Sequence, residues 1–138
     1  MQIKHIQKFD PDLIKSLFAK AGECDVTLNQ RFFDNNNNIL LISFYDSEPT
    51  GFLYAYIIEG LKANRSKIFL YSIDVFEKFQ KQGVGTQLIK ELKKIAKKRL
   101  CHEVFVMTNK NNTAAMKLYK KTGGKIEKDD DVLFVYSQ

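Results

Sequence analysis

The boundary between an apolar run and a long helical pattern near the middle of the chain constrains the fold most. The run at 67–76 is rich in β-branched and aromatic residues, as in a strand, and the polar segment 77–85 that follows it contains Gly83 and Gly85. From Val84 onward, apolar residues recur at helical spacing, with lysines on the opposite face. The pattern therefore predicts a strand, a glycine-containing loop and a long amphipathic helix in direct succession.

The predicted start of this helix has the chemistry of an anion site. The first backbone N–H groups of a helix have no intrahelical partner, and the helix dipole favours negative charge there. Gly83 and Gly85 let a phosphate approach the backbone, and Thr86 adds a hydroxyl donor. Further side-chain donors are offered by Gln80, Lys81 and Gln82. The loop lacks the Gly-Lys-Ser/Thr of a P-loop and the Gly-x-Gly-x-x-Gly of a dinucleotide fold. A simple loop-to-helix turn is the alternative.

The remaining patterns predict one domain over residues 1–138. Strands are expected at 2–8, 39–45, 52–58, 67–76, 104–108 and 132–136, with turn chemistry at 46–51. Helices are expected at 10–22, more weakly at 28–33, and at 84–99 and 112–121. This order predicts an α+β (α/β three-layer) domain, with a single sheet and helices on its faces.

A second informative stretch is 112–124. By itself it is interpreted as an Asn-capped helix with Ala115, Met116 and Tyr119 on its inward face, ended by a pair of glycines. A tyrosine at this spacing is usually a core residue.

Taken together, the two stretches resemble the GCN5-related N-acetyltransferase (GNAT) family. Two motifs carry the resemblance: Gln80-x-x-Gly83-x-Gly85, which is similar to the pyrophosphate loop, and Asn112-x-x-Ala115-x-x-Leu118-Tyr119-x-x-x-Gly123, which is similar to the family's later motif. One long helix and one strand separate them, as in the family, and the similarity covers about residues 50–124. Gly124 departs from the pattern, because the family usually has an aromatic residue there. The resemblance implies a mixed, mostly antiparallel sheet with helices on both faces.

The resemblance also implies an N-acetyltransferase that moves an acetyl group from acetyl-coenzyme A (acetyl-CoA) to a primary amine, without a metal. The pyrophosphate is expected on the loop amides from Gln82 to Thr86, and the pantetheine arm on the preceding strand. A backbone N–H near Val75 would polarise the thioester carbonyl. The implied cofactor-binding residues are Ile73, Val75, Gln80, Lys81, Gln82, Gly83, Val84, Gly85, Thr86, Asn112 and Tyr119.

The catalytic residues that we expect are Tyr119, Asp74 and Glu77. A lysine-like amine is mostly protonated at pH 7, so a base is useful. Strand alternation puts Ser72 and Asp74 on one face. Asp74 is the first candidate for the base, Glu77 the second and a water chain the third. The resemblance places Tyr119 to give a proton to the leaving thiolate.

The acceptor is less constrained. The segments 55–71 and 83–93 are similar to aminoglycoside 3-N-acetyltransferases, which implies a small-molecule amine such as an aminoglycoside. Such polycations need acids, and the cluster 129–131 with Glu59 is a candidate, although a solvated acidic turn is the simpler interpretation. The alternatives are a protein or peptide N-acetyltransferase of the same fold, or a nucleic-acid-binding module that uses the lysine-rich helix. That basic stretch has no interleaved aromatic residues and no reader motif, which disfavours nucleic acid.

Composition limits the bound metals, the disulfides and the cellular location that we expect for the protein. The net charge is +6, and the two cysteines, Cys24 and Cys101, are isolated in sequence, so neither a metal site nor a disulfide framework is expected. No secretory opening and no bilayer-spanning run is recognised, so we expect a cytoplasmic protein that is not bound to a membrane. Family members are often dimers, which makes a homodimer an expectation by analogy.

Overall fold

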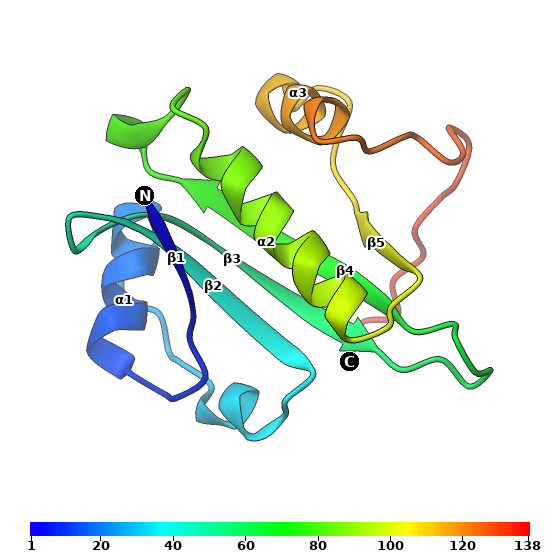
Figure 1. Ribbon diagram of the computed structural model, residues 1–138, viewed down its shortest axis with the longest axis horizontal. Coiled ribbons are helices and arrows are strands. Elements are labelled where there is room, and N and C mark those ends of the chain that lie inside the picture. Colours follow the sequence, from blue (N-terminus) through cyan, green and yellow to red (C-terminus); the bar gives the residue numbers. More distant parts are fainter.

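The β-branched and aromatic runs of the chain form one sheet in the computed structural model, which describes residues 1–138 (Figure 1). Its strands are β1 (Gln2–His5), β2 (Asn38–Tyr45), β3 (Glu48–Ile58), β4 (Lys67–Val75) and β5 (Glu103–Val106), and they lie side by side in this order. The pairs from β1 to β4 are antiparallel, whereas β4 and β5 are parallel. The sheet is therefore mixed and mostly antiparallel, as expected.

Helices cover both faces of this sheet. They are α1 (Pro11–Lys20), the 3₁₀ turns η1 (Gln30–Asp34) and η2 (Glu77–Phe79), α2 (Val84–Lys98) and α3 (Thr113–Lys121). The start of α1 follows the sequence signal: the Asp10 carboxylate accepts a hydrogen bond from the Leu13 N–H at 3.2 Å, and Pro11 occupies the first turn. In Figure 1, α2 lies across β3 and β4.

Two apolar clusters hold these layers together, one on each face. The apolar face of α2, with Leu88 and Leu92, packs on inward residues of β2, β3 and β4 such as Leu53. On the opposite face, residues of α1 such as Leu17 pack on Leu40, Ile42 and Phe52. Successive residues of β3 divide between the clusters because side chains alternate along a strand. The α+β class and the sheet with helices on both faces are confirmed.

Several boundaries differ from the sequence prediction, most clearly at the hairpin. The turn expected at 46–51 is only two residues long: Asp46 and Ser47 both have positive φ, at 47° and 70°, and β3 begins at Glu48. Such two-residue turns match the twist of the flanking strands. The buried Thr50 hydroxyl donates to Ser43 Oγ at 2.9 Å across the hairpin, which allows this polar segment to enter the sheet.

The strand expected at 132–136 is not formed. No backbone hydrogen bond joins residues 125–138 to the rest of the chain, and the side chains of Val132 to Tyr136 are 73–88% exposed. Figure 1 shows the chain after α3, in orange to red, running past β5 as an irregular segment that joins no strand of the sheet. The physical reason is that strand propensity acts only through a partner: a strand must pair its N–H and C=O groups with another edge, and within this one chain the segment pairs with none.

Candidate active site

The start of α2 offers unpaired backbone donors. Gly83 precedes the helix with φ +84° and caps it without a side chain, and the N–H groups of Val84, Gly85 and Thr86 make no hydrogen bond. A side chain added at Gly83 would meet no atom within 4 Å, so open space adjoins this turn. Free donors, the positive end of the helix dipole and open space together suit a phosphate group.

Gly85 has a different role from the one that its spacing suggested. It lies inside the helix, and a Cβ there would come within 3.0 Å of Leu118 Cδ2. Its lack of a side chain therefore lets α2 and α3 pack closely, rather than letting a phosphate approach. Glycine is therefore required at position 85, but for helix packing and not for phosphate binding.

The polar side chains before the helix mostly hold the loop itself. Gln80 Nε2 donates to the Val75 carbonyl at 3.1 Å, and Gln82 Nε2 donates to the Lys78 carbonyl at 3.2 Å. Lys81, by contrast, is exposed and its side chain is not hydrogen-bonded. Of the three predicted side-chain donors, Lys81 alone keeps its full donor capacity for a ligand.

The parallel strands β4 and β5 part near this loop. They pair over four positions, from Lys67 with Glu103 to Leu70 with Val106. The remaining part of β4, from Tyr71 to Val75, has no partner on that side. Ile73 and Val75 thus lie on a stretch of strand whose outer edge is free to hydrogen-bond an extended molecule.

Asp74 faces the side of the sheet that α1 covers. Asp74 pairs with Phe52 and Ser72 pairs with Tyr54 across β3 and β4, and paired residues of antiparallel strands point to the same face. Ser72 and Asp74 therefore share a face, as strand alternation predicts. Burial raises the pKa of Asp74 above its usual value, and the nearby charge of Glu23 raises this pKa further.

The other predicted acid–base residues differ in their surroundings. Tyr119 is half-buried against the α2 cluster, and burial raises its pKa, so its hydroxyl stays protonated at neutral pH. Glu77 is exposed in η2. Asn112 caps α3: its Oδ1 accepts from the Ala115 N–H at 3.1 Å, while its Nδ2 makes no hydrogen bond. The amide of Asn112 can therefore cap the helix and still donate to a ligand.

Sequence reasoning did not identify a group of tyrosines around Tyr54, which pairs with Ser72 on the face that also bears Asp74. Tyr54 and Tyr71 are stacked with ring centroids 5.4 Å apart, and Tyr56 meets Tyr71 edge-on at 5.8 Å. Burial is the main cause of the raised pKa of both Tyr54 and Tyr56. The alternation of Phe52, Tyr54 and Tyr56 along β3 was the available signal, because it places three rings on one face.

The acids proposed for the acceptor are not assembled. Glu59 follows the end of β3, and its carboxylate accepts hydrogen bonds from Asn37 and Ser66, both at 3.2 Å. The acids at 129–131 are exposed in the segment that leaves the fold. The acid that lies near Asp74 is instead Glu23, at the end of α1.

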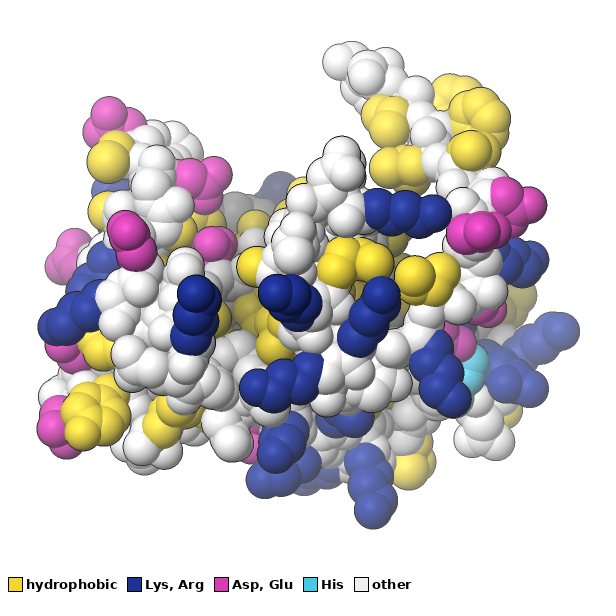
Figure 2. Space-filling view, turned by 90° about the horizontal axis from the view of Figure 1, so that it is seen from above, with side chains coloured by type: hydrophobic (Ala, Val, Ile, Leu, Met, Phe, Trp, Pro, Cys, Tyr) yellow, Lys and Arg dark blue, Asp and Glu magenta, His cyan; other side chains and the backbone are white.

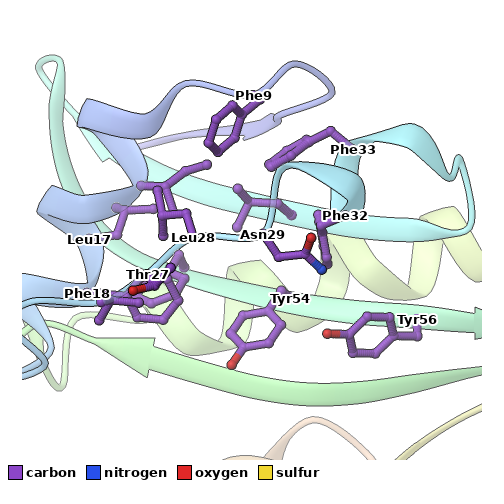
Figure 3. Close-up of a pocket in the computed structure, with 14 residues that line it drawn as sticks. Phe9, Leu17, Phe18, Thr27, Leu28, Asn29, Phe32, Phe33, Tyr54 and Tyr56 are labelled. Carbon is purple, nitrogen blue, oxygen red and sulfur yellow. The ribbon is translucent and has the colours of Figure 1, made fainter.

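A pocket opens on the same face of the sheet as Asp74 (Figure 3). It lies between α1, the loop before η1, η1 itself and the strands β2 and β3, and its volume is about 210 Å³. Figure 3 shows Phe9 and Phe33 on one side of the pocket, with Tyr54 and Tyr56 on the β3 side. Twelve of its fourteen lining residues are hydrophobic and none is charged.

Comparison with known families identifies the chain. The Acetyltransferase (GNAT) family matches residues 6–124, and the chain therefore belongs to this family of acetyltransferase enzymes, which use acetyl-CoA. No match was found among curated proteins. No helix has the length and apolar character to cross a bilayer, and no cluster of three or more potential metal-binding side chains is present.

Solved structures share the fold at low sequence identity. An aminoglycoside acetyltransferase, meta-AAC0020, from an uncultured soil metagenomic sample and in complex with sisomicin, has a TM-score of 0.85 and 23% identity, with coverage of 99% of this chain and 95% of that one. Aminoglycoside N-acetyltransferase AAC(6')-Iy in complex with CoA has a TM-score of 0.78 and 21% identity, with 99% coverage of both chains. Ribosomal-protein-alanine N-acetyltransferase from Brucella melitensis biovar Abortus 2308 has a TM-score of 0.79 and 15% identity, with coverage of 98% and 100%.

The raised pKa of Asp74 predicts a pH-dependent stability effect. Folding raises this pKa, so the ionised carboxylate destabilises the folded state above the folded pKa, and this cost disappears below the unfolded pKa of about 3.9. Asp74→Asn should therefore increase the free energy of unfolding at pH 7, and its advantage should vanish at about pH 3. Urea denaturation at both pH values measures this. The exposed Asp129→Asn is the control, expected to change stability by less than about 0.5 kcal/mol. A loss of stability in Asp74→Asn at pH 7 would contradict the interpretation.

Proposed function

We propose that this enzyme transfers an acetyl group from acetyl-CoA to a primary amine of a small molecule. The observation that carries the proposal is the start of α2, where three unpaired backbone N–H groups adjoin open space beside the point at which β4 and β5 part. These features suit, in order, the diphosphate and the extended arm of coenzyme A.

The residues present fit this cosubstrate. The amides from Gln82 to Thr86 would hold the pyrophosphate, with Lys81 as an added charge. The free edge of β4 at Ile73 and Val75 would pair with the arm, and the unbonded Nδ2 of Asn112 would donate to it. The Val75 N–H would polarise the thioester carbonyl, an effect worth roughly 10²- to 10³-fold in rate for one such donor.

Acetyl-CoA supplies the acetyl group as a thioester: the amine nitrogen bonds to the carbonyl carbon, the C–S bond breaks and a thiolate leaves. The amine must first lose a proton, which costs about 4–5 kcal/mol at pH 7 for a lysine-like amine. Asp74 is our first candidate to take that proton, because its raised pKa makes it a stronger base than an ordinary aspartate. Glu77 is the second candidate and a water chain the third. Tyr119, which burial keeps protonated, would give its proton to the thiolate.

The structural neighbours suggest aminoglycosides as the first acceptor class to test. The charge distribution is compatible with a basic chain that accepts amines, because the acidic side chains are concentrated in parts of the surface. In the view of Figure 2, Lys and Arg side chains are most numerous over the middle and lower part of the molecule, whereas Asp and Glu side chains lie mainly toward its two sides, where some Lys and Arg side chains lie beside them. A net charge of +6 therefore does not prevent a cation from approaching the acidic regions.

Gly83→Glu tests the coenzyme site. The substitution places bulk and negative charge in the open space beside the unpaired donors, so we expect the affinity for acetyl-CoA to fall at least about 100-fold. Gly22→Glu is a matched control, since Gly22 also has positive φ, at 92°, and open space around it, but lies at the end of α1. Both variants carry similar backbone strain. Isothermal titration measures affinity, and equal affinities in the two variants would refute the assignment.

Tyr119→Phe tests the proton donor. The ring and its packing on the α2 cluster are kept while the hydroxyl is lost. We expect kcat to fall by about 10²-fold with little change in acetyl-CoA affinity, because general acid catalysis typically contributes about 10²- to 10⁴-fold. Tyr45→Phe, at an exposed position at the end of β2, is the control. Full turnover in Tyr119→Phe would exclude this role.

We also propose that the enzyme is a homodimer that forms through its C-terminal segment. Five consecutive apolar residues, 132–136, are exposed, although their sequence favours a strand. The outer edge of β5 is unpaired within the chain, and an exposed edge is a template for strand addition from another chain. In a dimer, residues 132–136 of each copy would pair as a strand with the free outer edge of β5 in the other copy.

Truncation after Asp131 tests the dimer. Removing 132–138 should convert a dimer into a monomer, as measured by light scattering after size exclusion, because the strand-forming residues are lost. Truncation after Tyr136 removes only the last two residues and should leave the dimer intact. A full-length protein that is monomeric at about 100 μM would contradict the proposal.

A further inference from the structure

We infer that the pocket between α1, η1 and β3 binds an aromatic ring carried by the acceptor amine, so that the preferred acceptor is an aryl-alkyl primary amine. The inference deepens the proposed acetyl transfer and rests on it for the fate of the amine. It starts from an apolar cavity that the coenzyme site does not use, because the coenzyme site lies at the start of α2.

The size of the pocket limits what enters it. Its volume of about 210 Å³ exceeds that of an apolar cavity of about 150 Å³ that binds benzene, and is below the range of about 300–1,000 Å³ typical of sites for whole drug-sized ligands. One six-membered ring with a short substituent therefore fits. The rest of the acceptor must lie outside.

The lining of the pocket favours an aromatic group. Seven of the fourteen lining residues are aromatic. The rings of Phe18 and Phe52 meet edge-on at 5.6 Å, and those of Phe32 and Tyr56 do so at 5.9 Å. Aromatic rings prefer such tilted and edge-to-face neighbours, so a lining rich in aromatic residues suits an incoming ring.

The same lining disfavours a polycation inside the pocket. Thr27 and Asn29 are its two non-hydrophobic residues, and neither carries a charge. An ammonium group that entered would lose hydration without gaining an ionic partner, which is costly. The pocket therefore discriminates against acceptors that are charged along their whole length.

The position of the pocket connects it with the proposed chemistry. Phe52 and Tyr54 line the pocket, and across the sheet they pair with Asp74 and Ser72. The charge of Glu23 acts on both Asp74 and Tyr54, so a second carboxylate lies at the same end. A ring held in the pocket would direct an amine on a short chain toward the end of the pocket where Phe52 and Tyr54 neighbour these acids.

Binding is tested first without catalysis, using 2-phenylethanol, which has a ring and a two-carbon chain but no amine. In NMR titrations we expect the methyl signals of Ile14, Leu17 and Leu28, all of which line the pocket, to shift, while those of the exposed Leu61 stay unchanged. No shift at the pocket methyl groups up to about 20 mM would overturn the inference. Competition of 2-phenylethanol with a peptide of residues 131–138 would also overturn it, because the occupant would then be a second copy of this chain.

Kinetics test the link to the amine by thiol release from acetyl-CoA. We expect kcat/KM for 2-phenylethylamine to exceed that for ethylamine, spermidine and kanamycin by at least about tenfold. Leu28→Phe, which fills the pocket, should raise KM for 2-phenylethylamine about tenfold and leave KM for ethylamine unchanged, because ethylamine has no ring. Leu61→Phe makes the same substitution at a fully exposed site and should change neither. A higher kcat/KM for kanamycin, or equal effects of Leu28→Phe on both amines, would overturn the inference.

The two proposals fail in distinguishable ways. If acetyl-CoA does not bind and no amine is acetylated, the proposed function fails, and the NMR shifts alone then decide whether the pocket accepts a ring. If acetyl transfer occurs without preference for an aryl amine, the proposed function stands and the inference about the acceptor falls.

Discussion

The backbone donors at the start of α2 are the constraint on which the proposed active site depends. The first turn of any helix leaves N–H groups that the helix itself cannot pair, and here Gly83 begins the helix without a side chain to cap them. The helix cannot shift to hide these groups, because Leu88 and Leu92 are fully buried against the sheet and Gly85 touches Leu118 of α3. Core packing therefore preserves an unsatisfied anion site.

Strand β4 connects the proposed coenzyme site with the proposed amine site. Along β4, Ile73 packs with the cluster on the α2 face, while Ser72 and Asp74 pair with residues of the α1-face cluster. The same strand has a free edge where β5 has parted from it. A coenzyme on the edge of β4 and an amine on its α1 face would meet at adjacent residues. Strand alternation, with a period of two, is sufficient to create this arrangement.

The α1 face also explains why charge alone is a poor guide to the acceptor. The chain is basic, and its clearest acidic run lies in the exposed C-terminal segment. The acid whose charge acts on Asp74 is Glu23, which is far from it in sequence and also acts on Tyr54. Two acids that neighbour residues lining an aromatic pocket suit an amine with an apolar body better than a polycation.

Local patterns in the sequence determined much of the fold and the coenzyme side of the site. Helical spacing and capping residues identified α1, α2 and α3, and alternation placed Ser72 and Asp74 on one face, because these signals depend on neighbours within a few residues. The glycine loop and the Asn112 motif were sufficient by themselves to indicate the family. Only the tertiary structure decided that Gly85 serves helix packing, that Glu59 is occupied by Asn37 and Ser66, and that Glu23 approaches Asp74. It also decided that residues 132–136 form no strand within this chain. These outcomes depend on contacts between residues that are distant in sequence, and strand propensity alone forms no strand where a segment pairs with no neighbouring edge.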